Sequence, residues 1–211
     1  MVPPALALDR WQGRTHVSLV ALRMHHVRVR GWQVPGFTAH PQVNFRTYVR
    51  EGDRAGVWFI RQLVPNRLIA AVGRWCYGEP FATAPIECTA TQTDAEARVE
   101  YRIARRWRVA AETGPTIGRP AAGSVAAYFQ ERYLGYRLDR RGRLTVFRVE
   151  HPPWGRREVR RFEWHIDWAM LYGVRWGVLN ERRPVSTIYA DGSEVAAYSP
   201  APLTDSTNTS P

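Results

Sequence analysis

Three side chains suited to binding a small anion share one face of a predicted strand. The stretch VNFRTYVR, residues 43–50, alternates between two faces and places Asn44, Arg46 and Tyr48 on the same one. A guanidinium stays charged in proteins, and inside a sheet it needs a carboxylate or a phosphate as its partner. Arg46 is therefore the residue from which a functional hypothesis starts.

Two kinds of partner for Arg46 are open from the sequence. One is an internal carboxylate, with Glu87 and Glu131 as candidates, which would make Arg46 part of a structural ion pair. The other is a ligand, a small carboxylate held by Arg46 with Asn44 and Tyr48 as hydrogen-bonding neighbours.

Aromatic residues and one histidine could complete such a site. His151 lies in an EHPPW bend whose two prolines fix the backbone, so the bend is either a rim that aims a side chain or a structural corner. Trp58, Tyr77 and Trp154 are candidates for the walls of a cavity, although aromatic residues in a barrel also form its core. If the site is catalytic, His151 or Glu79 is the candidate general base.

Motifs for metal, cofactor or covalent chemistry are missing from the sequence. It contains no HExxH, no GxSxG, no paired Cys/His motif at zinc spacing and no Gly-rich phosphate loop. His25 and His26 are adjacent and would point to opposite faces of a strand, so they cannot chelate one metal ion. We expect no metal and no cofactor, and the sequence assigns no catalytic residue.

The elements that must position these residues are mainly strands. Residues 43–50 and 57–64 form a predicted hairpin, and a helix follows that is capped by Asn66 and ends at Gly78. One face of this helix carries Leu68, Val72, Trp75 and Cys76. Other predicted elements are strands at 16–30, 86–91, 97–109, 144–149 and 158–164, a loop at 112–123, helices from Ser124 to near Gly135 and at 166–173, and a last hairpin of 185–189 with 195–198. This order favours a mainly β (α+β) fold, an antiparallel barrel or curled sheet with two or three helices.

Length and cysteine content bound the class of protein. The chain has 211 residues, enough for one domain, expected at 1–203 and followed by a disordered tail at 204–211. Its two cysteines lie in no CxxC pattern, and it has no secretory leader and no apolar run of the ~20 residues that a membrane span needs. We expect a cytoplasmic protein without membrane contact, and the oligomeric state is not predicted.

The charge of the chain is strongly positive, and all 30 basic residues are arginine. A net charge of +11 would suit a nucleic acid or an anionic surface as partner. The arginines are spread along the chain, however, and those in residues 97–109 alternate with apolar residues, which is typical of the solvated face of a strand. We therefore do not expect nucleic acid as the partner and keep an arginine-driven binder as an alternative.

Five segments of the chain resemble the YqjF-like family, a domain of unknown function. They are WQGRTHVSLVALRM, FTAHPQVNFRTYVREGDRAGVWFI, GSVAAYFQERYLGY, GRLTVFRVEHPPW and IYADGSEVAAYSPAPL. The NxRTYV and HPPW elements are the most specific, and the resemblance extends from the first residues to about Leu203. This family is placed in the acetoacetate-decarboxylase-like superfamily, so the resemblance implies a cone-like antiparallel β-barrel around a closed pocket.

The same resemblance implies that Schiff-base chemistry is absent. True decarboxylases of the superfamily use a lysine in a Gly-x-Pro-Lys-Lys element, to which the segment from Gly78 to Ala82 is similar, but Phe81 and Ala82 stand where the lysines would be. They also carry a glutamate at or next to the position of Arg46 and Thr47, and neither of these is a carboxylate. The resemblance thus implies the fold and the pocket without the reaction, and leaves open whether the protein is an enzyme.

Relatives in this family usually begin with a further helix and strand before the stretch that corresponds to Pro3 to Asp9, so we expect this chain to lack them. The leading hypothesis is a YqjF-like protein that binds a small organic anion in a barrel pocket. The alternatives are an enzyme of unknown reaction with His151 or Glu79 as general base, and an arginine-driven binder of nucleic acid or an anionic surface.

Overall fold

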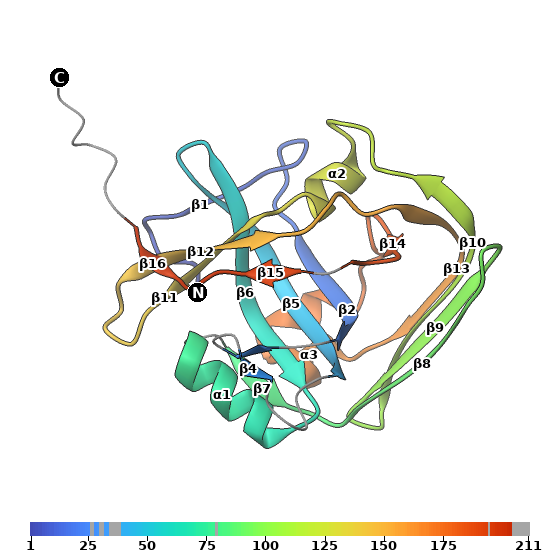
Figure 1. The fold of residues 1–211 in the computed structure, drawn as a ribbon, viewed down its shortest axis with the longest axis horizontal. Helices are drawn as coiled ribbons and strands as arrows, with labels where there is room; N and C mark the ends of the chain where they lie inside the picture. Colours follow the sequence, from blue (N-terminus) through green and yellow to red (C-terminus); the bar gives the residue numbers. More distant parts are fainter. Residues whose placement is uncertain (26–27, 30–31, 34–38, 79, 194, 204–211) are drawn as a thin grey trace.

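The computed structural model describes residues 1–25, 28–29, 32–33, 39–78, 80–193 and 195–203. The predicted tail at 204–211 lies outside the described residues, as does His26. Most strands belong to two curled sheets, one of nine strands and one of five, that surround a concave interior (Figure 1). The expected mainly β fold with few helices is confirmed, in the form of a half-barrel.

The larger sheet is built on the hairpin of β5 (Ala39–Glu51) and β6 (Arg54–Val64). The outer edge of β5 pairs with β1 (Ala7–Leu8) and then with β2 (Val17–His25). Beyond β6 the sheet continues through β11 (Leu134–Leu138), which runs parallel to β6, to β12 (Leu144–Glu150). Its short strands are β7 (Phe81–Thr83), β15 (Ala196–Ala197) and β16 (Ala201–Pro202).

The central hairpin confirms the predicted strands and turn but not the predicted burial. Strand β5 is buried on both faces rather than on one. Val43 and Phe45 lie in the main hydrophobic core, while Asn44 and Tyr48 on the opposite face are also buried. Other elements cover both sides of this strand, so its polar face is turned inward and not toward solvent.

The smaller sheet has the strand order β14-β13-β10-β9-β8. Its strands are β8 (Ile86–Gln92), β9 (Ala97–Ile103), β10 (Trp107–Gly118), β13 (Arg156–His165) and β14 (Tyr189–Ala190). The prediction of one strand at 97–109 was wrong, because Ala104 and Arg105 adopt positive φ angles of 51° and 58° and turn the chain back. The predicted loop at 112–123 was also wrong, since β10 continues through most of it.

Helix α1 (Arg67–Tyr77) begins and ends as predicted. The Asn66 side chain accepts a hydrogen bond from the Leu68 amide at 2.7 Å, and Gly78 closes the helix with a left-handed φ of 62°.

The predicted face of α1 is buried only in part, because Val72 packs against the sheet while Leu68 and Trp75 do not. Leu68 and Trp75 are 59% and 67% exposed, whereas Ile69 and Ala70 form the contact with the sheet. The contact is decided by Phe81 of β7, whose ring packs so close to Gly73 that a β-carbon there would clash.

The remaining helices are short, namely α2 (Val125–Gln130), α3 (Trp168–Tyr172) and the 3₁₀ helix η1 (Val174–Leu179). The predicted helix ending near Gly135 was too long, because the chain turns after Gln130 and enters β11 at Leu134. The predicted last hairpin was wrong as well, since β14 pairs with β13 in one sheet and β15 with β12 in the other. A two-stranded ribbon of β3 (Arg28–Val29) and β4 (Trp32–Gln33) lies apart from both sheets.

The main core lies between the central hairpin, the smaller sheet and α3. The ring of Phe45 contacts Tyr172, Trp176 and Trp168, with centroids 4.5, 4.6 and 5.4 Å away. This core holds one face of β5 in place and leaves the other face to the interior. Among the described residues, the helices are all too short or too polar to cross a bilayer.

Candidate functional site

The concave interior of the half-barrel encloses about 3280 Å³. Cavities fitted to small ligands measure roughly 300–1,000 Å³, so the volume alone does not locate a site. The position of the buried polar side chains does, and these gather on the inner face of β5.

Arg46 projects into this cavity and is only partly buried. Its Nη2 atom donates to the carbonyl oxygen of Phe129 at 3.0 Å, and its guanidinium lies 5.7 Å from the ring centroid of Tyr48. In the part of the chain that the structure describes, no ion pair includes Arg46. The internal pair with Glu87 or Glu131 is therefore not formed, and the buried Nε atom has no hydrogen-bond partner among the described residues.

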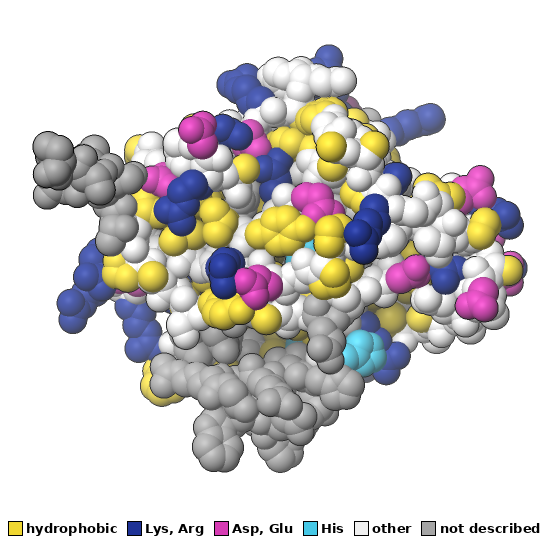
Figure 2. Space-filling view, turned by 45° about the horizontal axis from the view of Figure 1, so that its top comes forward, with side chains coloured by type: hydrophobic (Ala, Val, Ile, Leu, Met, Phe, Trp, Pro, Cys, Tyr) yellow, Lys and Arg dark blue, Asp and Glu magenta, His cyan; other side chains and the backbone are white. Residues whose placement is uncertain are grey.

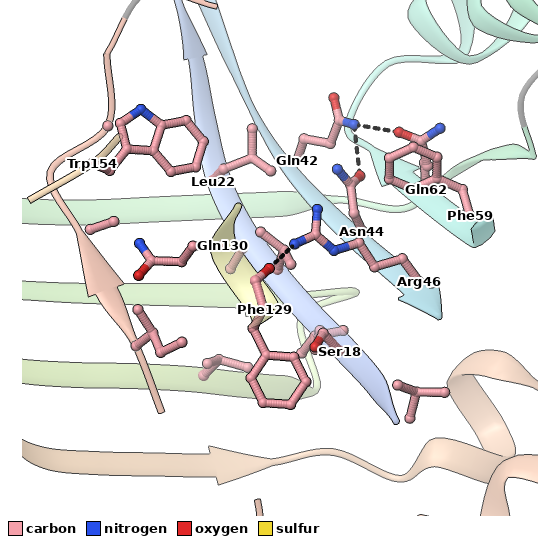
Figure 3. A pocket seen from close by; sticks show the side chains of 18 of the residues that line it. Ser18, Leu22, Gln42, Asn44, Arg46, Phe59, Gln62, Phe129, Gln130 and Trp154 are labelled. Atoms are coloured by element: carbon pink, nitrogen blue, oxygen red, sulfur yellow. Dashed lines mark hydrogen bonds between the residues drawn. The ribbon is translucent and has the colours of Figure 1, made fainter. Parts of the chain in front are cut away.

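A row of three buried amides lies next to Arg46 (Figure 3). The Nε2 atom of Gln42 donates to Asn44 Oδ1 at 2.7 Å and to Gln62 Oε1 at 2.9 Å. These two bonds use the acceptor oxygens of Asn44 and Gln62, so both amide nitrogens point away from Gln42. Together with Arg46 they make this wall rich in hydrogen-bond donors.

Tyr48 lies beneath Arg46 and is fixed on several sides. Its hydroxyl shares a 2.7 Å hydrogen bond with Ser18, and its ring contacts Tyr128 and Phe129 of α2 at 5.1 and 5.2 Å. Burial, and secondarily the charge of Asp9, raises the pKa of Tyr128 to about 12. The three predicted neighbours on β5 are thus together at the cavity wall.

The lining of the cavity is positive. Among the described residues, seven arginines and two acidic residues line it. Both acids are already paired, Asp191 with Arg157 at 2.6 Å and Glu150 with Arg148 at 2.5 Å. On the outer face in Figure 2, by contrast, arginines lie dispersed among aspartates and glutamates.

His151 and Trp154 also line the cavity, and they form part of a stack. Their rings are nearly parallel with centroids 4.0 Å apart, and the ring centroid of Tyr133 is 4.8 Å from that of His151. Trp154 Nε1 donates to Ser193 Oγ at 2.8 Å. Burial, and secondarily its hydrogen bond to Glu131, raises the pKa of Tyr133 to about 12.

Of the other predicted residues, one lies away from the site and two lie where the structure does not describe the side chain. Trp58 packs against the cluster of Leu6, Val49 and Tyr136 and is not among the cavity residues. Its side chain faces away because Trp58 pairs with Thr47, which lies on the face of β5 opposite Arg46. Farther along β6, Ile60 is an extra residue that shifts the register between Phe45 and Arg46. The Tyr77 side chain and Glu79 lie outside the described residues.

The segment that resembles the lysine-bearing element does reach the interior. Phe81 lines the cavity and pairs with Gln62 across the parallel β6–β7 ladder, while Ala82 packs on the main core. An aromatic ring thus occupies the place that the resemblance gives to an amine. Within the described residues, no group of three or more His, Cys, Asp or Glu could hold a metal ion.

Three glutamines of the site were missed by sequence reasoning. Gln42 and Gln62 lie next to the predicted strand face, so strict alternation outward from Asn44 would have included Gln42. Gln130, at the end of α2, also lines the cavity and is buried. No local pattern distinguishes it from an exposed helical glutamine.

The sequence of the chain matches the model of a family described as an uncharacterized conserved protein, DUF2071, over residues 1–194. The chain belongs to this family. Among curated proteins, the uncharacterized protein YqjF of Bacillus subtilis (strain 168) is 26% identical over 163 residues, which are 73% of this chain. The chain spans only 64% of the length of that relative.

Solved structures show that this DUF2071 protein has the acetoacetate-decarboxylase-like fold. Acetoacetate decarboxylase from Legionella pneumophila subsp. pneumophila str. Philadelphia 1 superposes with a TM-score of 0.55 at 13% identity, covering 89% of this chain and 72% of that one. A second acetoacetate decarboxylase structure gives 0.54 at 14% identity, covering 90% and 72%. The predicted YqjF-like relationship is confirmed by the family match, and the predicted fold is confirmed by the solved structures, whose likeness at this identity concerns the fold alone.

Proposed function

We propose that this DUF2071 protein binds a small organic carboxylate in the half-barrel, with Arg46 as the cation that anchors it. The observation that carries the proposal is a partly buried guanidinium in the cavity wall whose described contacts include a backbone carbonyl but no carboxylate. A charged hydrogen bond from arginine to a carboxylate is stronger than one to a neutral carbonyl, so an entering anion would be favoured.

The surroundings of Arg46 support an anion over a cation. The Asn44 amide nitrogen adds a donor on the same wall, and Tyr48 supplies a hydroxyl and an aromatic face. The excess of arginine over paired acids in the lining adds a long-range attraction for negative charge. Phe59 and Phe129 provide apolar surface for the carbon skeleton of the ligand (Figure 3).

The proposed role does not include Schiff-base decarboxylation. That reaction needs an amine, and the chain contains no lysine among its 30 basic residues. Phe81 takes the position that the resemblance assigns to a lysine.

A screen of short aliphatic and aromatic carboxylates by thermal shift, followed by calorimetry, tests the proposal. We expect at least one acid to bind the wild-type protein and to lose affinity by about tenfold or more in Arg46→Met, because the charged hydrogen bonds are removed. A screen in which no acid stabilises the protein would contradict it.

Arg61→Met is the matched control. Arg61 also lies in the central hairpin and also donates to a backbone carbonyl, that of Leu171 at 3.2 Å, but it does not line the cavity. Both variants remove one arginine and one similar hydrogen bond. Equal loss of affinity in the two would show a general effect of charge and would reject Arg46 as the anchor.

A further inference from the structure

Gln130 carries a buried amide that forms no hydrogen bond with any described residue. The residue is only 9% exposed, and both its Nε2 and its Oε1 atoms are unpartnered. Buried amides in folded proteins are nearly always hydrogen-bonded, because leaving one unpaired costs the full desolvation of its polar atoms. This amide faces the cavity (Figure 3).

The backbone that presents Gln130 is held firmly. Helix α2 is capped by Ser124, whose Oγ accepts from the Ala127 amide at 3.2 Å. Immediately after the helix, Arg132 forms a 2.8 Å ion pair with Asp9, and both side chains are at least nine-tenths buried. The backbone position from which Gln130 extends is therefore set before any ligand arrives.

Arg46 and Gln130 both line the cavity and meet at neighbouring points of its wall. The guanidinium of Arg46 donates to the carbonyl oxygen of Phe129, and the carbon of that carbonyl is bonded directly to the backbone nitrogen of Gln130. The carbonyl that holds the Arg46 guanidinium and the backbone nitrogen of Gln130 thus belong to one peptide group.

We infer that the ligand is a carboxylic acid that also carries a neutral amide, with its carboxylate on Arg46 and its amide on Gln130. This inference rests on the proposed carboxylate site and adds a second recognition element to it. A carboxamide presents one donor and one acceptor side by side, which is also what a primary amide or lactam of a ligand presents, so the two groups pair in both directions. A ketone would satisfy only Nε2, and a second carboxylate would place an acceptor against Oε1.

The test compares acids of nearly the same shape. Succinamate, levulinate and succinate differ only in the group at one end, which is an amide, a methyl ketone or a carboxylate. Glutaramate, 5-oxohexanoate and glutarate repeat the comparison with a longer spacer. Calorimetry on the wild-type protein should show that an amide acid binds about tenfold or more tightly than its ketone and its diacid, because a site built to hydrogen-bond a group rejects analogues that lack it.

The variant Gln130→Leu should remove this preference and bring the affinities for amide and ketone to within about twofold of each other. Gln130→Met provides a second apolar side chain of similar length if the leucine variant does not fold. Gln92→Leu, at an exposed glutamine in β8 that does not line the cavity, should leave the preference unchanged.

The outcomes separate this inference from the proposed function. Acids that bind through Arg46 without any preference for an amide, or a preference that survives Gln130→Leu, would overturn the role of Gln130 while the carboxylate site stands. Failure of every acid to bind the wild-type protein would overturn both.

Discussion

Two arginines lie near the ring of Tyr48, and they differ in burial and in bonding partner. The guanidiniums of Arg132 and Arg46 are 5.3 and 5.7 Å from its centroid. The Arg132 side chain is 6% exposed and forms an ion pair with Asp9. Asp9 also forms an ion pair with Arg50, whose Nε atom lies 3.1 Å from Asp9 Oδ1. Arg46 faces the cavity, and its Nη2 atom donates to the neutral carbonyl oxygen of Phe129.

The comparison indicates that Arg132 contributes to the stability of the fold, whereas Arg46 is available to a ligand. Asp9 follows β1, so its pair with Arg132 joins the first strand of the chain to the end of α2. A buried charge that is compensated within the protein serves the structure, whereas one that faces a cavity can serve a ligand. The two sites are called the Arg132 site and the Arg46 site below.

The largest expected effect is the loss of stability in Arg132→Met. Removal of one partner of a buried ion pair leaves the other charge uncompensated, which costs about 3 kcal/mol in the free energy of unfolding, here moderated by Arg50. Urea denaturation measures this loss. Arg46→Met should lose less than about 1 kcal/mol in the same experiment, because a single hydrogen bond to a carbonyl is removed.

A double-mutant cycle with Asp9→Asn checks the physical reason for that loss. If the ion pair is responsible, the double variant Asp9→Asn with Arg132→Met should be less destabilised than the sum of the single changes. Additive losses, or an Arg46→Met variant as unstable as Arg132→Met, would remove the distinction between the two sites.

The second largest effect is expected for Asn44→Asp, which would place a carboxylate next to Arg46 as Asp9 is placed next to Arg132. Asn44 lies two residues from Arg46 on the same strand face, and Asn44→Asp keeps the oxygen that accepts from Gln42. The new carboxylate should compete with the ligand for Arg46 and weaken the binding of any acid found in the screen by about tenfold. Calorimetry measures the loss, and unchanged affinity would argue that Arg46 does not hold the carboxylate.

The smallest effect concerns Tyr128, which lies 4.2 Å from the Arg132 guanidinium. Its folded pKa, raised to about 12, exceeds the unfolded value near 10, so the folded state holds this proton more tightly. The resulting stability is complete below pH ~10 and is lost as the pH rises through ~12. Tyr128→Phe should therefore lose less stability than the wild type between these pH values in thermal unfolding.

Tyr198→Phe is a suitable control for that comparison, because Tyr198 is 44% exposed and lies at the surface. An equally steep alkaline loss in wild type and Tyr128→Phe would show that the buried hydroxyl is not responsible.

Local signals explain what could be predicted from the sequence. The central hairpin follows from alternation and a glycine turn, and α1 follows from the Asn66 cap and the glycine at its end. These features are determined by neighbours in the chain. The alignment of Asn44, Arg46 and Tyr48 on one wall followed from the same alternation.

Features decided by distant contacts could not be predicted in this way. The exposure of Trp75 depends on where Phe81 packs, and the compensation of Arg132 depends on Asp9, far away in the sequence. The burial of Gln130 could not be predicted, because a buried and an exposed glutamine at the end of a helix have the same local sequence pattern. Trp58 was misplaced because its aromatic character alone does not show which face of β6 it occupies, whereas its pairing with Thr47 does.

The extra residue in β6 has a consequence for how the cavity could vary within the family. Because Ile60 is inserted opposite the Phe45–Arg46 step, Gln62 and Phe59 share the inner wall although they are an odd number of positions apart. Deletion of this one residue would restore regular alternation and leave Phe59 opposite Arg46 and Gln62 opposite Asn44. A homologue whose strand is one residue shorter at this point would therefore keep the same inner wall beside Arg46, so the family can gain or lose this residue without changing the side chains that a ligand meets.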